Sequence, residues 1–204
     1  MDNKYKVLLI LEGTYPFNGG GVSTWSHMLC NEVKNADFDL YSINASFEIK
    51  PKYELGQNIK NIVQVPLWSP LEPQEMVDYG KKFYKIVRTK ERSDDKDIVE
   101  KFIPIFKKLI TSIYSDTRVA KDFDDIIYGM WKYFQTHDYK KTMLHEEVWK
   151  TFCLLVKEII SKDNEHATLY DLTLGMRWIY RFLIPLSIDV PKADISHLTI
   201  SGFP

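Results

Sequence analysis

Three consecutive glycines, Gly19 to Gly21, separate a short apolar run from a segment with the spacing of a helix. The run KVLLIL at residues 6–11 is apolar and branched, which predicts a strand buried on both faces of a parallel sheet. From Val22 to Val33 the apolar residues recur three and four positions apart, which predicts a helix that buries its apolar side. The glycines therefore lie in a strand-to-helix loop, and a chain with this unit is constrained to an α/β fold.

Further strands are expected on both sides of a long middle segment. Three more runs predict strands, namely FDLYSIN at 38–44, NIVQVPLW at 61–68 and ADISHLTI at 193–200. The residues between them lack strand signals and show helical periodicity. We expect a Rossmann-like parallel sheet in residues 1–68 and 189–204, with a large all-helical insertion at 69–188 between the third strand and the last.

Several residues of the middle segment belong to the types that begin or bend helices. One helix is expected after Ser69 and another after Thr142, with each hydroxyl as the N-cap. Thr168 and Asp171 have the spacing of a capping box, which predicts the start of a further helix. Pro104 predicts a kink in the helix that contains it.

The charge balance excludes some classes of partner. The chain has 27 Lys and Arg against 28 Asp and Glu, a formal net charge of −1, so no overall positive charge attracts it to nucleic acid or to an anionic membrane. Cys30 and Cys153 have neither metal-ligand spacing nor the pattern of a disulfide framework, which favours a reducing compartment. We expect a cytoplasmic protein whose association with the inner face of the membrane, if any, depends on partners.

The glycine loop allows two interpretations. A helix N-terminus preceded by glycines presents unpaired backbone N–H groups and the positive end of the helix dipole, which together bind phosphate. Alternatively, the glycines form a tight turn that needs a positive φ at one or two positions. The position directly after the first strand favours the phosphate interpretation.

Familiar nucleotide and catalytic motifs do not fit this sequence. A Walker loop would need Lys-Ser or Lys-Thr after Gly21, and the dinucleotide fingerprint would need a glycine at Thr24 and a carboxylate near Asn44. An NAD-dependent enzyme is therefore a weak alternative. The segment HEEVW at His145 lacks the second histidine of a zinc helix, and no Gly-x-Ser-x-Gly elbow occurs. No metal or cofactor is expected.

Two segments of the sequence resemble a known family. The segment LLILEGTYPFNGGGVSTWSHML at residues 8–29 closely resembles the opening of the PelF-type glycosyltransferases. These enzymes make the Pel exopolysaccharide and belong to family 4 of the retaining glycosyltransferases with the GT-B fold. The segment PKADISHLTISGFP at 191–204 is similar to the Asp-x-x-His-x-x-x-x-Gly segment of that family. The helical middle is similar to the domain of unknown function that precedes the family's sugar-nucleotide half.

The resemblance implies a transferase with two Rossmann-like halves that face each other across a cleft, of which this chain would supply the acceptor-side half. The donor would be a UDP-sugar and the acceptor a glycan. The resemblance implies that the loop after the first strand closes over the donor diphosphate, with Gly20 and Gly21 as backbone donors, Gly19 as a spacer and Val22 beside them. It further places His197 in the catalytic site near the transferred sugar.

The same resemblance leaves other parts of the mechanism open. Glu12, Thr14 and Tyr15 are expected to line the cleft, but no carboxylate can be assigned as a general base. The pair of glutamates that grips the donor in the family's other half is absent from this sequence, so the partner would be a C-terminal glycosyltransferase domain. We expect the 204-residue chain to be inactive by itself.

A second hypothesis is a non-catalytic interaction module. The helical insertion holds Trp131, Trp149 and Trp178, which could dock on the membrane subunits of a polysaccharide synthase complex. An aromatic stripe at helical spacing is more often part of a core. Binding of a uridine nucleotide would favour the transferase, and capture of membrane partners without it would favour the interaction module.

Overall fold

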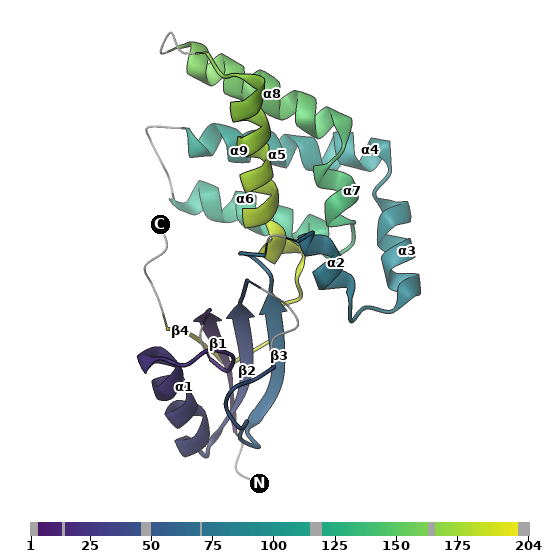
Figure 1. The fold of residues 1–204 in the computed structure, drawn as a ribbon. Helices are drawn as coiled ribbons and strands as arrows, with labels where there is room; N and C mark the ends of the chain where they lie inside the picture. Colours follow the sequence, from purple (N-terminus) through teal and green to yellow (C-terminus); the bar gives the residue numbers. More distant parts are fainter. Residues whose placement is uncertain are drawn as a thin grey trace. The chain divides into compact units, whose positions relative to one another are not determined.

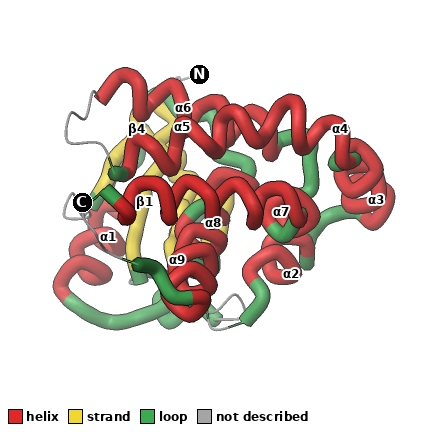
Figure 2. The backbone as a smooth tube through the Cα atoms, turned by 90° about the horizontal axis from the view of Figure 1, so that it is seen from above, coloured by secondary structure: helices red, strands yellow, loops and turns green. Residues whose placement is uncertain are grey.

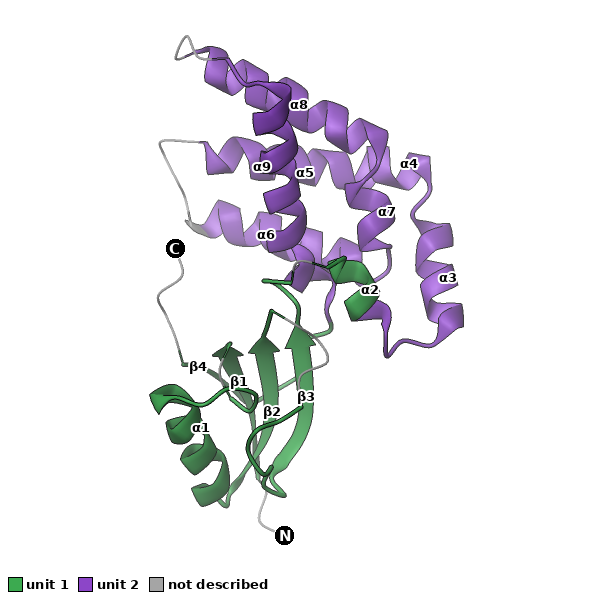
Figure 3. Cartoon of the chain, in the orientation of Figure 1, with its two compact units in different colours: residues 1–76, 189–204 green, residues 77–188 purple. Residues whose placement is uncertain are grey.

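A computed structural model of the chain describes residues 4–13, 15–45, 50–69, 71–114, 120–162 and 166–199. Contacts divide the chain into two units, which are coloured separately in Figure 3. Residues 1–76 and 189–204 form the sheet unit, and residues 77–188 form the helical unit. Within the described residues, no helix combines the length and the apolar character that a transmembrane helix needs.

The sheet unit contains four parallel strands in the order β3-β2-β1-β4 (Figure 1). They are β1 (Tyr5–Glu12), β2 (Ala36–Ile43), β3 (Ile59–Val65) and β4 (Ile195–Leu198). The helix α1 (Gly21–Glu32) connects β1 to β2. This order matches the first four strands of the doubly wound Rossmann arrangement, so the predicted α/β class and parallel sheet are confirmed.

The core of the sheet unit follows from the alternation of side chains along β1. Leu9 and Leu11 are almost fully buried and pack in one cluster with Leu40 of β2 and Cys30 of α1. Full burial of each leucine side chain contributes about 1.5 to 3 kcal/mol. The sheet is therefore held by the apolar run that predicted the first strand.

The start of β4 is fixed to β1 by one carboxylate. The N–H of Lys6 donates to Oδ2 of Asp194 at 2.9 Å, and the N–H of Asp194 donates to the carbonyl oxygen of Lys6 at 2.8 Å. Val7 then lies opposite Ile195, and Leu9 opposite His197. Asp194 thus has a structural role, and the register that it sets determines where His197 lies.

The helical unit consists of the helices drawn in red in Figure 2 other than α1 and α2 (Pro73–Asp78). Its core is made of aromatic and branched side chains from several of these helices. Its helices are α3 (Phe83–Arg92), α4 (Asp95–Asp97), α5 (Ile103–Ile113), α6 (Ala120–Phe134), α7 (Tyr139–Met143), α8 (Glu146–Ser161) and α9 (Leu169–Phe182). Along the chain, the division between the units falls after Met76, within α2. Phe102 and Phe106 are fully buried, and their rings stack with centroids 5.7 Å apart. Such aromatic pairs stabilise a core beyond the area that they bury.

The predicted helix starts have different outcomes. The capping box at Thr168 is confirmed, because its hydroxyl accepts from the N–H of Asp171 and the Asp171 carboxylate accepts from the N–H of Thr168. The cap at Thr142 is wrong, since Thr142 lies inside α7 and is fully buried. The N-cap of α8 is His145, whose Nδ1 accepts from the N–H of Glu147 at 3.2 Å.

One further expectation for the helical segment needs correction. The single helix expected after Ser69 is divided into α2 and α3, and Gly80 lies in the turn between them. Glycine disfavours a helix interior, which explains the interruption.

Pro104 follows a π-helical segment at Ile98–Phe102, which runs on into α5 without a break. Proline lacks the N–H that a helix interior uses and clashes with the preceding turn, so an irregular helix directly before Pro104 has a physical cause.

Candidate functional site

The three glycines of the loop have three different local environments. Gly20, the N-cap of α1, has φ 149° and ψ 172°, a conformation open essentially to glycine alone. A Cβ on Gly19 would lie 3.0 Å from Nζ of Lys52, the flexible end of a side chain. A Cβ on Gly21 would meet nothing within 4 Å, and Gly21 has no positive φ. The fold explains the glycine at position 20 but gives no reason for the one at position 21.

The N-terminus of α1 has no cap from a side chain. No carboxylate lies in its first turn, and the N–H of Thr24 bonds to the carbonyl oxygen of Gly20 at 2.9 Å. Among the described residues, the N–H groups of Gly21 and Val22 have no acceptor. These groups and the positive end of the helix dipole form a place where an anion is stabilised.

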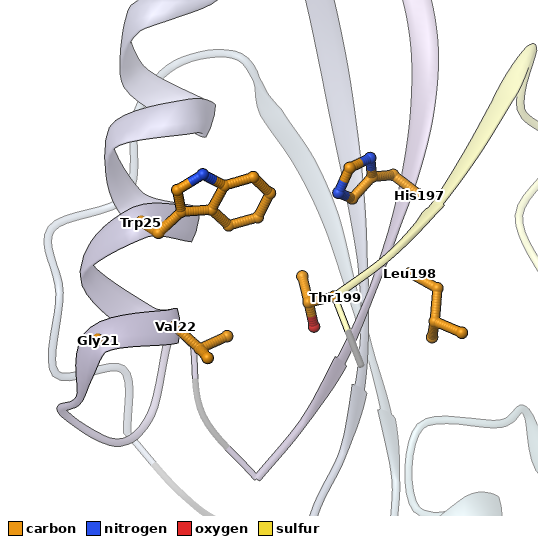
Figure 4. Close-up of a pocket in the computed structure, with 6 residues that line it drawn as sticks. All are labelled: Gly21, Val22, Trp25, His197, Leu198 and Thr199. Atoms are coloured by element: carbon orange, nitrogen blue, oxygen red, sulfur yellow. The ribbon is translucent and has the colours of Figure 1, made fainter. Parts of the chain in front are cut away.

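A hollow of about 380 Å³ lies between this helix end and the end of β4. Its lining residues are Gly21, Val22, Trp25, His197, Leu198 and Thr199, all of which Figure 4 shows. The strand order reverses between β1 and β4, and open α/β sheets bind ligands outside the carboxyl ends of the strands at such a switch point. The hollow therefore lies where this fold class places its ligands.

His197 is held by an aromatic neighbour across the hollow. The rings of Trp25 and His197 lie next to each other in Figure 4, with centroids 5.4 Å apart and planes inclined by 28°. Neither ring nitrogen of His197 has a hydrogen-bond partner within the described part of the chain. The imidazole is thus oriented by stacking, while its nitrogens can bond to a ligand.

Gly21, Val22 and His197 are therefore brought together, whereas the residues expected to line the cleft are not among those around the hollow. Glu12, at the end of β1, accepts a hydrogen bond from Nε1 of Trp68 at 3.2 Å. Thr14 lies outside the described residues.

Tyr15 belongs to the core and not to the cleft surface, contrary to its expected position. The residue is fully buried, its ring packs beside Tyr53, and its hydroxyl lies 3.4 Å from Nδ1 of His27. Burial raises the pKa of the Tyr15 hydroxyl well above its usual range. A large ring with a polar tip gains more from this enclosed position than from an open surface.

The side of α1 that faces the sheet is also different from the expected one. Ser23, Ser26 and Cys30 are fully buried, whereas Trp25 is 44% exposed and Met28 is 59% exposed. Small side chains allow the start of the helix to approach the sheet closely, so Trp25 and Met28 stay outside, whereas Leu29 and Val33 of the predicted apolar side do pack against the core. This arrangement is why Trp25 reaches the hollow. Sequence reasoning counted Trp25 as a core residue, and only the alternation of small with large residues in VSTWSHM signals its exposure.

A second hollow of about 380 Å³ lies at the opposite ends of the strands and has a structural explanation. Asn58 donates to the carbonyl oxygens of Cys30 and Val33, and Nζ of Lys34 contacts the carbonyl oxygen of Asn31. These donors satisfy the C-terminal carbonyl groups of α1. Within the described residues, no group of three or more His, Cys, Asp or Glu is placed to hold a metal ion.

The comparisons with known proteins give one match. The family model described as "Domain of unknown function (DUF3492)" matches residues 5–204. No curated protein and no protein of solved structure matches the chain. The matched range contains both elements of the hollow, the glycine loop with α1 and the strand β4.

Proposed function

The chain belongs to the DUF3492 family, and we propose that it is the N-terminal, acceptor-side domain of a retaining UDP-sugar-dependent glycosyltransferase. The exopolysaccharide that the enzyme builds would be of the Pel type, as the resemblance of residues 8–29 and 191–204 to PelF-type enzymes implies. A C-terminal domain with the nucleotide-sugar site would complete the enzyme, so the chain by itself would bind its donor weakly and transfer no sugar.

The environment of Gly21 carries the proposal. Glycine has a poor helix propensity, and neither the backbone conformation nor any neighbouring atom requires it at this position. A ligand that approaches the unpaired N–H groups of the helix end would require it, because a Cβ would stand between the ligand and the backbone. The diphosphate of a sugar nucleotide has the charge and the size for this approach.

His197, on the opposite wall of the hollow, fits the sugar end of such a donor. In retaining transfer the leaving diphosphate gains negative charge while the anomeric carbon becomes cation-like, and an enzyme stabilises both changes by fixed dipoles and by positioning. The N–H groups of Gly21 and Val22 would bind the diphosphate. The imidazole of His197 would hydrogen-bond a hydroxyl of the transferred sugar from the opposite wall of the hollow.

Amide chemical shifts of the chain, titrated with UDP and with uridine, test this proposal. UDP should shift the signals of Gly21 and Val22, whereas uridine, which lacks phosphate, should leave them unchanged. Fast exchange is expected, because only one half of the donor site is present. An absence of shifts at both residues up to millimolar UDP would contradict the proposal.

One observation supports the second hypothesis, a non-catalytic interaction module. Of the three tryptophans of the helical unit, Trp178 is 49% exposed and stacks on Phe182 of the same helix with centroids 5.6 Å apart. An exposed aromatic pair suits a protein interface. The UDP titration separates the two functions, because the interaction module predicts no response in the glycine loop.

A further inference from the structure

The helix α3 (Phe83–Arg92) contains no buried residue. Figures 1 and 2 show it at the edge of the helical unit, next to α4. By contrast, α5 of the same unit buries four side chains, Ile103, Phe106, Leu109 and Ile110. An isolated helix of this length is marginal in water, so α3 is a preformed helix that is held by the unit and presents most of its surface.

The helix α3 exposes three large apolar side chains. Ile86 and Thr89, one turn apart, are its half-buried residues and mark the side toward the unit. Tyr84, which is 59% exposed, and Val87, which is 36% exposed, lie on the side away from them, and Phe83, one turn before Ile86, is 79% exposed. Two aromatic side chains and a valine on one exposed surface need a reason, because soluble proteins seldom gather such residues without a binding role.

The same segment is strongly basic. Residues 81–92 contain six Lys or Arg and one acidic residue, a net formal charge of +5 in a chain whose total is −1. Lys81 pairs with Asp78 at 3.0 Å. Within the described residues, the side chains of Lys82, Lys85, Arg88 and Arg92 form no ion pair. The positive charge that the overall composition hides is concentrated beside the exposed aromatic rings.

We propose that α3 docks on an anionic lipid surface. A helix with exposed aromatic and aliphatic side chains beside a cluster of Lys and Arg has the composition of helices that lie in the membrane interface. Phe83 and Val87 would enter the boundary between headgroups and acyl chains, and the Tyr84 ring would lie at headgroup level with its hydroxyl in water. The long stems of Lys85 and Arg88 would let their charges reach the lipid phosphates. The contact is peripheral and independent of the proposed sugar-nucleotide site.

Features of α3 favour lipid over other anionic partners. The aliphatic Val87 offers no stacking surface to a nucleic acid base, and the row of Lys85, Arg88 and Arg92 runs beside the exposed apolar residues, so that both can reach one surface. The surface belongs to a regular helix that needs no ordering on binding. Each Lys or Arg near an anionic bilayer contributes about fivefold in partitioning, so four unpaired cations give strong attraction even with shallow insertion.

Vesicle flotation of the purified chain tests the proposal. Vesicles of equal parts phosphatidylglycerol and phosphatidylcholine should carry the chain to the top of the gradient, and vesicles of phosphatidylcholine alone should not. Added salt should weaken the binding, because it screens the charges. Absence of binding to the anionic vesicles, or equal binding to both kinds, would overturn the proposal.

Matched variants locate the surface. Lys85→Glu with Arg88→Glu should lower partitioning at least about twentyfold, while Lys107→Glu with Lys108→Glu on α5, the same charge change at exposed positions, should have a small effect. Phe83→Ala with Tyr84→Ala should lower it about tenfold, and the control is Leu169→Ala with Tyr170→Ala, an equally exposed pair. Because α3 buries no residue and the control positions are exposed, all four proteins should keep the melting temperature of the parent chain.

The controls decide the outcome. If the α5 charge variant loses as much binding as the α3 charge variant, the attraction is a general charge effect and the α3 surface is rejected. If the chain ignores vesicles but binds single-stranded RNA or an acidic peptide through Lys85 and Arg88, the surface belongs to that partner and the lipid proposal fails. Loss of vesicle binding in the α3 variants, with both controls unchanged, supports it.

Discussion

The indole of Trp25, at the start of α1, stacks on the imidazole of His197, the third residue of β4. The ring centroids are 5.4 Å apart, and the planes are inclined by 28°. This contact restricts the tilt of the imidazole and leaves its edge, which carries both nitrogens, free of partners within the described residues. His197 can therefore bind a ligand through its ring nitrogens, while Trp25 positions that ring by stacking on it.

Replacement of His197 tests the binding function. In a full-length enzyme that carries this domain, we expect His197→Ala to lower kcat by about tenfold to a thousandfold, or about 1.4 to 4 kcal/mol, because a hydrogen bond made best in the transition state is lost. UDP affinity and the melting temperature should change little. A fall in melting temperature at an unchanged rate per folded molecule would instead make His197 a structural residue at the end of a strand.

Replacement of Trp25 tests the positioning function. Trp25→Ala should lower kcat less than His197→Ala does, and Trp25→Phe should restore most of it, since a phenyl ring can still stack. In the double variant the two effects should not add, because Trp25 acts through His197. Met28→Ala, on the same exposed side of α1, is the control and should leave kcat unchanged. Additive losses would show that Trp25 acts independently of His197.

The glycine loop offers two substitutions with opposite expectations. Gly20→Ala should lower the free energy of unfolding by about 1 to 3 kcal/mol, because alanine resists the backbone conformation at that position. Gly21→Ala should leave stability unchanged or raise it by up to about 1 kcal/mol, since space is open and alanine favours a helix.

Only Gly21→Ala tests UDP binding separately from stability. Urea unfolding measures stability, and calorimetry with UDP on the full-length enzyme measures affinity. We expect Gly21→Ala to weaken UDP binding in a fully folded protein. An unchanged affinity would assign all three glycines to the shape of the loop and remove the diphosphate from it.

The pH dependence of stability should report on Cys30. Burial raises the pKa of the Cys30 thiol to about 12, so the folded state holds this proton more tightly than the unfolded state does. The stabilisation is complete below the pKa of the unfolded thiol, about 8.5, and falls by about 1.4 kcal/mol for each pH unit above it. Urea midpoints at about pH 8 and about pH 10 measure this fall, which should be smaller in Cys30→Ala.

Alkylation gives an independent measurement of the same burial. In the native chain, the partly exposed Cys153 should react with iodoacetamide before the fully buried Cys30. Cys30 should react at the rate of a free thiol only in urea. Equal rates in the native chain would contradict the buried position of Cys30.

The sequence was sufficient wherever a local pattern determines a local structure. The apolar run that became β1 needs burial on both faces, and the spacing of Thr168 and Asp171 allows two reciprocal hydrogen bonds. Both features depend on neighbouring residues only. The same reasoning failed at Thr142, because its hydroxyl lies near that of Tyr133, at 3.4 Å, inside the helical core.

The site itself depends on distant residues and could be predicted only in part. The glycine loop and His197 were identified from motifs, but their approach across the hollow depends on the register between β1 and β4. Trp25 was missed because hydrophobic spacing does not say which side of α1 meets the sheet. Packing decided this, since serines at positions 23 and 26 fit closer to the strands than an indole does.

The pairing of β1 with β4 has a consequence for synthesis on the ribosome. The bond between Lys6 and Asp194 spans 188 residues, so at about 5 to 20 residues per second β1 waits about 10 to 40 s for its second neighbour. Residues 77–188 emerge in this interval and can fold through their own contacts. Meanwhile one edge of β1 stays open to other nascent chains. The late arrival of β4 therefore leaves β1 with an unpaired edge, and a risk of aggregation, during most of the synthesis of the chain.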